Sequence, residues 1–383
     1  MNKLLAAALL SLAALNLRAN SDIEKHDRNM LVENAVVTNG VKWIDGRYLP
    51  LEGKAFEEVS LYYDRLPKCM TTNINAGVRS MRHHTSGMLF RFATDSTRLT
   101  VKWVPLNKTL SMYHMPSTGM SGIDVYRYDK AKRGWFYVKT GGIRERAKGG
   151  QISIPWTPGD DCIINLPLYN GIKEFSLGID EKANVYKPRK RRSGIENPVV
   201  FYGTSITHGG CASRPGMGFV NIVGRKCDVP VVGLGFSGSG VMEYELSGII
   251  AKINASLYVI DTPWNMNTIP GNPRSIQSNY EPFLRNLRAL KPDIPILLVE
   301  PCDVYLGSGE NASLITEKRK LIKGIYLKLI SEGWKGLHYL PNTSLLGDDF
   351  EGTVDGVHLN DLGMMRMADG LTKAVSEILK LKR

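Results

Sequence analysis

A serine near the middle of the chain follows a short apolar run and a glycine. The run covers residues 199–203 and ends at Gly203, and Ser205 comes two residues later. Its β-branched and aromatic residues favour a strand, so we expect the serine hydroxyl at the end of a buried strand. A serine hydroxyl is a weak nucleophile unless a base and an oxyanion site converge on it. The chemistry therefore depends on whether the chain also supplies those groups.

A histidine near the C-terminus has a carboxylate three residues before it. Asp355 and His358 stand in the stretch Asp-Gly-Val-His, and one tight turn lets the carboxylate hold the imidazole. In such a set the histidine takes the proton of the serine, while the carboxylate fixes the ring tautomer and stabilises the imidazolium. The predicted catalytic triad is therefore Ser205, His358 and Asp355.

Four sequence blocks, taken in order, resemble those of the SGNH (GDSL-type) hydrolases, a family of esterases, deacetylases and acyltransferases. Block one reads Gly-Thr-Ser at 203–205, with threonine in place of the family's aspartate, and block two spans 233–240. Block three, 261–266, lacks the family's glycine, and block five, 355–363, is a close match. The resemblance implies oxyanion donors from the backbone N–H of Ser205, the backbone N–H of Gly238 and the side chain of Asn265.

The elements downstream of residue 193 must position these residues. Short apolar runs at 231–234, 257–260 and 294–299 alternate with longer helical patterns such as 313–330. This rhythm predicts a parallel sheet covered by helices on both faces, with functional residues at the carboxyl ends of the strands. Together with the resemblance, it predicts an α/β, three-layer SGNH-hydrolase-like domain over 193–383.

The half before it has the period of two that is typical of strands with one buried face. Leu99, Val101 and Trp103 alternate with polar residues, and glycine-containing turns punctuate the segment. We therefore expect an antiparallel β-sandwich from about residue 38 to 185, within an N-terminal domain and linker over 20–192. A chain of 383 residues exceeds the roughly 250–300 at which single cores stop growing, which also favours two domains.

The segment 114–126 contains Gly-x-Asp-Val-Tyr, which resembles the Gly-x-Asp-Leu-Tyr signature of an N-terminal β domain attached to a subset of these hydrolases.

At the start of the chain, Lys3 precedes an apolar run from 4 to 15 that is too short to span a membrane. Residues 1–19 are therefore predicted to be a signal peptide, which implies a secreted or periplasmic protein with no integral membrane segment after its removal.

The charge and the cysteines indicate no further chemistry. Of the net charge of +12, five positive charges lie in 187–192, which we interpret as a solvated interdomain run, so no nucleic-acid partner is expected. None of the five cysteines sits in a Cys-x-x-Cys pair, and structural thiols, at least one of them unpaired, are expected. The sequence holds no phosphate loop and no metal motif, so neither a cofactor nor a metal is predicted.

Three residues are candidates for contact with substrate. His208 lies one turn beyond Ser205, Trp264 adjoins Asn265, and His114 precedes the β-domain signature. Each has a structural alternative: an exposed helix residue for His208, core or lid packing for Trp264, and an internal turn of the sandwich for His114.

The function predicted from the triad is that of a serine esterase acting through an acyl-enzyme. Family resemblance and export point to acetyl or other short acyl esters on a carbohydrate, so the expected partner is an acylated small molecule or carbohydrate. Acyl transfer by the same triad is an alternative. Since blocks one and three are altered, a carbohydrate-binding protein with a degenerate hydrolase domain is another.

Overall fold

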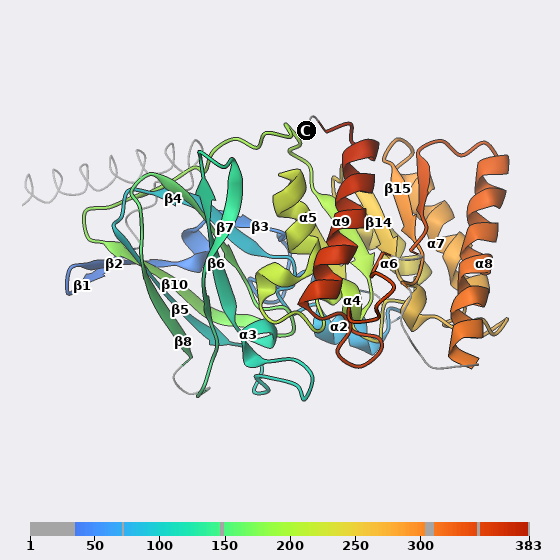
Figure 1. Cartoon of the computed structure of the whole chain (residues 1–383), viewed down its shortest axis with the longest axis horizontal. Helices are drawn as coiled ribbons and strands as arrows, with labels where there is room; N and C mark the ends of the chain where they lie inside the picture. The colour runs from blue at the N-terminus through green and yellow to red at the C-terminus, as the bar shows by residue number, and fades with distance from the viewer. Residues whose placement is uncertain (1–34, 71–72, 146–148, 303–309, 343–344, 382–383) are drawn as a thin grey trace, which may run out of the picture.

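The computed structural model describes residues 35–70, 73–145, 149–302, 310–342 and 345–381. The predicted signal peptide lies outside these ranges. The described chain forms a β-rich body and an α/β body that lie side by side, with helix α8 (Glu310–Ser331) on the far side from the β-rich body (Figure 1). No helix in the described ranges combines the length and the apolarity that are needed to cross a membrane.

The N-terminal body is an antiparallel β-sandwich, as the period of two predicts. Its strands are β1 Val36–Thr38, β2 Val41–Asp45, β3 Leu51–Glu52, β4 Leu89–Thr94, β5 Arg98–Pro105, β6 Ile123–Asp129, β7 Gly134–Gly141, β8 Gly150–Pro155, β9 Asp160–Asn165, β10 Ile172–Asp180 and β11 Val185–Tyr186, with the short helices η3 Gly46–Tyr48 and α3 Ser117–Met120. One sheet has the order β1-β2-β10-β5-β8 and the other β11-β4-β9-β6-β7, and β3 pairs with β4.

The sandwich core follows the alternation in β5, where Leu99, Val101 and Trp103 are buried between the sheets. Strand β4 differs, because both of its faces are largely covered. On its outer face, Arg91 donates a hydrogen bond to the carbonyl of Arg189 in the interdomain connection. The linker therefore covers the second face of this strand. The alternation of residues in the sequence does not predict this contact, because the linker is distant in the chain.

The segment between β3 and β4 leaves the sandwich and packs on the α/β body. It carries helix α2 (Ala76–Met81), and its Leu66, Ile74 and Val78 belong to the core of the α/β body. The buried Arg65 donates to the carbonyls of Gly233 and Gly235 at 3.0 and 2.9 Å. The predicted boundary at 192/193 lies in the connection that follows the sandwich, and the packing of the segment between β3 and β4 means that the two bodies do not have independent cores.

The C-terminal body is the predicted α/β fold. Its strands are β12 Val199–Gly203, β13 Val231–Gly235, β14 Leu257–Asp261, β15 Ile296–Val299 and β16 Leu337–Leu340, and its helices are α4 Ser205–His208, α5 Phe219–Cys227, α6 Tyr244–Ile250, α7 Ile276–Leu290, α8 and α9 Asp361–Ile378, with η5 Pro215–Met217 and η6 Pro263–Asn265. All five strands are parallel, in the order β13-β12-β14-β15-β16.

Two apolar layers sandwich this sheet, which explains why its strands read as continuous apolar runs. In β12, Val199 and Phe201 face the layer with α5 and α9, whereas Val200 and Tyr202 face the layer with α6, α7 and α8. The next residue, Gly203, pairs with the last residues of both neighbouring strands. The loops that follow these three strands therefore meet at one edge of the sheet.

The interpretation of 187–192 as a solvated run holds for Lys187, Lys190 and Arg192, which are exposed, but it is wrong for Arg189 and Arg191. The guanidinium of Arg189 donates two hydrogen bonds to Asp228, of 2.9 and 2.8 Å, and lies 3.8 Å from the ring centroid of Tyr128. Arg191 forms an ion pair with Glu52. These arginines fix the linker between the two bodies, because Asp228 belongs to the α/β body whereas Tyr128 and Glu52 belong to the sandwich.

The five cysteines, all within the described residues, are unpaired, as expected of structural thiols, and all but Cys69 are buried.

Candidate active site

Ser205 is the first residue of α4 and is separated from the end of β12 by one residue. The preceding Thr204 has extended backbone angles, and its hydroxyl accepts a hydrogen bond from the N–H of Ile206 at 3.3 Å. Threonine is a good N-cap because its side chain satisfies a helix N–H that has no partner within the helix. The replacement of aspartate in block one therefore preserves the turn that presents Ser205, which is only 5% exposed.

Asp355 caps the turn that leads to His358. One carboxylate oxygen, Oδ1, accepts from the backbone N–H groups of Val357 and His358 at 3.0 and 2.7 Å. The other, Oδ2, lies 2.7 Å from Nδ1 of the His358 ring. The opposite ring nitrogen, Nε2, lies 3.0 Å from the hydroxyl of Ser205. The structure thus brings together three side chains from two segments about 150 residues apart.

The charge on Asp355 suits an orienting role. Partial burial by itself would raise the pKa of this carboxyl, but the hydrogen bonds from the His358 ring and from two backbone N–H groups outweigh it and hold the pKa below its ordinary value. The group is therefore a carboxylate at neutral pH, able to accept the Nδ1 proton and leave the lone pair of Nε2 facing Ser205.

The loops after β13 and β14 bring Gly238 and Asn265 to the same edge. Gly238 has a φ of 64°, a left-handed conformation that glycine adopts without strain. The Asn265 side chain accepts a hydrogen bond through Oδ1 from the N–H of Gly240, at 3.3 Å. The amide NH₂ of Asn265 therefore lies on the side away from the N–H of Gly240. Asn267, by contrast, uses Oδ1 to cap its own turn through the N–H of Ile269.

Arg274 ties these two loops together, and nothing in the sequence indicated it. Its Nη2 donates to the carbonyl of Gly238 at 2.6 Å and to that of Asn265 at 3.2 Å. One side chain therefore sets the spacing of two of the predicted oxyanion donors. The sequence could not reveal this, because an exposed arginine in a loop has no distinguishing local pattern.

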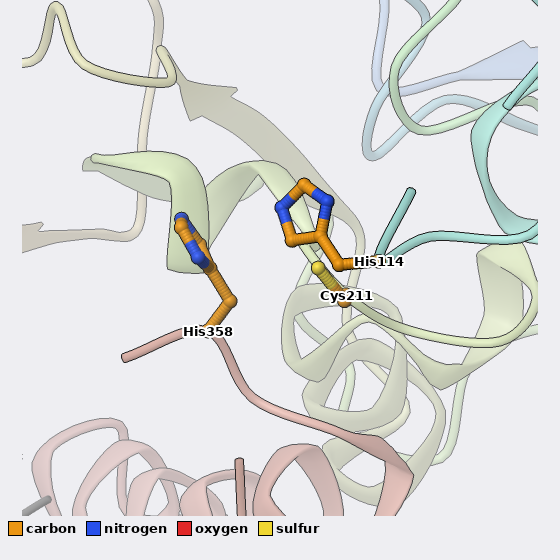
Figure 2. Close-up of side chains that lie close together, drawn as sticks. All are labelled: His114, Cys211 and His358. Carbon is orange, nitrogen blue, oxygen red and sulfur yellow. The ribbon is translucent and has the colours of Figure 1, made fainter. Parts of the chain in front are cut away.

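The β-sandwich contributes His114 to the site. Its ring packs edge-on against that of His358, with the centroids 5.4 Å apart, and the two side chains approach each other from different bodies of the molecule (Figure 2). Tyr113 stacks on the outer side of His114 at 4.2 Å and is 93% exposed. The structure thus places His114 beside the triad and adds Tyr113, which the sequence analysis missed.

The β-domain signature holds this arrangement in place. Asp124 is completely buried and accepts hydrogen bonds from the side chain of Asn165 at 2.8 Å, from Arg214 at 2.7 Å and from the N–H of Gly216 at 2.9 Å. Arg214 and Gly216 belong to the segment between α4 and α5, Gly216 within η5. The signature carboxylate therefore docks the sandwich onto the segment next to Ser205.

The structure covers the other two candidates for substrate contact to different extents. His208 is completely buried, stacks on Tyr169 with centroids 4.1 Å apart and lies within 3.2 Å of a ring nitrogen of His84. His208 therefore packs between the two bodies. A side chain with no exposed surface cannot contact substrate, so the prediction of substrate contact for His208 is wrong. Trp264 is half-buried and packs against the core beneath α5 and α9, which corresponds to the packing alternative.

Two family matches cover most of the chain. Residues 196–376 match the GDSL-like lipase/acylhydrolase family, and residues 41–185 match the GxDLY family, described as the N-terminus of SGNH-hydrolase-type esterases. A comparison with curated proteins finds no match.

Solved structures give a consistent result. A protein assigned as a GDSL-like lipase from Bacteroides ovatus is 27% identical with a TM-score of 0.78, over 89% of this chain and 99% of that one. A salicylyl-acyltransferase from a tetracycline biosynthetic pathway is 16% identical with a TM-score of 0.68, over 90% and 100%. A family two carbohydrate esterase from Cellvibrio japonicus is 14% identical with a TM-score of 0.54, over 89% and 98%. The last two likenesses concern the fold.

Proposed function

We propose that this protein removes acetyl or other short acyl groups from a carbohydrate. The chain belongs to the SGNH (GDSL-type) hydrolase family and is an ester hydrolase. The observation that carries the proposal is the hydrogen-bonded series in which Asp355 contacts Nδ1 of His358 at 2.7 Å and Nε2 lies 3.0 Å from Ser205. This is the geometry of a nucleophile with its base and the group that orients the base.

In the proposed reaction, the Ser205 oxygen attacks the ester carbonyl while Nε2 of His358 takes the hydroxyl proton. The negative charge on the carbonyl oxygen meets donors from Ser205 N–H, Gly238 N–H and the Asn265 amide. Collapse of the intermediate expels the alcohol, which receives the proton from His358. Water then attacks the acyl-enzyme, with His358 again as the base, and releases the carboxylic acid and free Ser205.

The surroundings of the triad support a short acyl group. The ligand-type atoms of His114, Cys211 and His358 all lie within 4.8 Å of one another, so these three side chains crowd the space on one side of the catalytic histidine. A small acyl group fits such a confined position better than a long chain does.

The outer rim supports a sugar as the alcohol. Tyr113 presents an almost fully exposed ring that is held flat by its stacking on His114. Aromatic faces of this kind supply rigid apolar contact area, on which the C–H face of a sugar ring can pack. The fold that the chain shares with family two carbohydrate esterases is consistent with this substrate class.

Acyl transfer uses the same residues, and the fold is also that of a salicylyl-acyltransferase. The two reactions differ in whether water or another hydroxyl compound attacks the acyl-enzyme. Membership of an ester-hydrolase family, together with the hydrogen bonds of the triad, argues against a degenerate domain that only binds carbohydrate.

The test is acetate release from a panel of acetylated polysaccharides, alongside hydrolysis of p-nitrophenyl esters with acyl chains of increasing length. We expect turnover to be highest for acetate and to fall with chain length. Ser205→Ala should abolish turnover without changing Tm, whereas Ser313→Ala, an exposed serine on α8, should leave it unchanged. Full activity in Ser205→Ala would refute the assignment, and acyl products that form only with an added alcohol would favour the transferase.

A further inference from the structure

We propose that His114, Cys211 and His358 form a binding site for Zn²⁺ or a similar divalent transition metal, and that the bound ion inhibits the enzyme by occupying its general base. The inference rests on the proposed function for its inhibitory consequence, but the binding of metal does not depend on that function. No local sequence pattern marks the site, because the three residues are about a hundred or more positions apart.

The three side chains converge from three separate segments. His114 comes from the sandwich, Cys211 from the loop after α4, and His358 from the loop before α9. Figure 2 shows the sulfur of Cys211 beside the ring of His114, with the ring of His358 facing both. One ligand atom from each residue lies within 4.8 Å of the other two.

These separations suit a tetrahedral ion after a small adjustment. With Zn–S of about 2.3 Å and Zn–N of about 2.0–2.1 Å, neighbouring ligand atoms of a tetrahedron are about 3.3–3.6 Å apart. Each side chain would therefore move inward by about 1 Å or less. His114 can turn without losing a hydrogen bond, because its buried Nδ1 has no partner in the part of the chain that the structure describes.

The ligand set selects the class of metal. Two imidazoles and a thiolate match Zn²⁺ and other borderline or soft transition metals, whereas Mg²⁺ and Ca²⁺ prefer oxygen ligands. Three protein ligands leave a fourth position for water or for the hydroxyl of Ser205. On binding, the Cys211 thiol loses its proton to solvent and the sulfur bonds to the metal as a thiolate.

Asp355 makes His358 a suitable ligand. Metal-bound histidines usually donate the other ring N–H to a carboxylate or carbonyl, which fixes the tautomer. Asp355 already holds Nδ1 at 2.7 Å, so the lone pair lies on Nε2. That lone pair is also the one that must take the proton of Ser205 at 3.0 Å. Metal and catalysis therefore compete for one atom, and the bound ion blocks turnover.

The test uses the full chain, freed of metal with a chelator, and titrates Zn²⁺ during p-nitrophenyl acetate hydrolysis. We expect saturable inhibition that the chelator reverses. Cys211→Ser should raise the half-inhibitory concentration at least about tenfold. The matched control is Cys69→Ser, since Cys69 is the exposed cysteine. Zn²⁺ should inhibit this variant at the same concentration as it inhibits the unmodified chain. Equal inhibition of Cys211→Ser and the unmodified chain would overturn the site.

A second measurement needs no activity. Ser205→Ala lacks the hydroxyl that competes for His358, and Co²⁺ added to it should give the thiolate-to-cobalt absorption and the intense visible bands of a tetrahedral site with one equivalent bound. His358→Ala and Cys211→Ala should each remove the thiolate band. No such band in Ser205→Ala would refute the metal site, even where Cys211→Ser folds poorly. The band in Ser205→Ala, together with an unmodified chain that hydrolyses no ester, would uphold the metal site and refute only the proposed reaction.

Discussion

Asp355→Asn is the substitution that most directly tests how the triad works. An asparagine retains Oδ1, which can still accept from the N–H groups of Val357 and His358, now at 3.0 and 2.7 Å. The turn that carries His358 should therefore persist. The change falls on the second atom, where an NH₂ donor replaces the Oδ2 acceptor that lies 2.7 Å from Nδ1 of the ring.

A donor at this position selects the wrong tautomer. The ring must then present a lone pair at Nδ1 and carry its proton on Nε2, the atom that faces Ser205 at 3.0 Å. A protonated Nε2 cannot take the serine proton. A change of this kind in a serine triad lowers kcat by about 10⁴, which corresponds to about 5 kcal/mol of transition-state stabilisation.

The assay is kcat and KM for p-nitrophenyl acetate, with Tm measured on the same samples. We expect kcat to fall by about 10⁴, with KM and Tm nearly unchanged. Asp348→Asn, an exposed aspartate in the same connection, is the matched control and should behave as the unmodified chain. A kcat within a factor of about ten of the unmodified value would show that Asp355 does not orient the base.

Three further predictions concern the surrounding residues. Asn265→Ala should lower kcat about 10²- to 10³-fold with little change in KM, as measured by steady-state kinetics. Arg274→Gln should lower kcat less, and Asn265→Ala should then cost less in that background, since both act on the same donors. Burial raises the pKa of Asp261 to about 7, although a hydrogen bond from Thr207 lowers it. The Asp261 carboxyl thus holds its proton more tightly in the folded chain than in the unfolded chain. The free energy of unfolding therefore falls as the pH rises from about 4 through 7. Asp261→Asn should accordingly raise Tm more at about pH 8 than at about pH 5.

Several features could be predicted from the sequence because they depend on neighbours along the chain. The apolar run before Ser205 specifies a buried strand, and the four residues from Asp355 to His358 form one turn whose hydrogen bonds are local. The alternation in β5 specifies a strand with one face in a core. The fold class follows from such periods, and the strand ends of a parallel sheet indicate where the site must lie.

Only the tertiary structure decided which further side chains meet the predicted triad there. The triad itself joins Ser205 and His358 across 153 positions, a pairing that the sequence indicated through its resemblance to the family blocks. His114 reaches the same ring from a different body of the molecule. The burial of His208 and the clamp formed by Arg274 likewise depend on what packs beside them. Local patterns report whether a residue has a covered face, but not which distant segment covers it. That choice is made by the packing of the whole chain, since contacts between remote residues form only when the bodies that carry them dock.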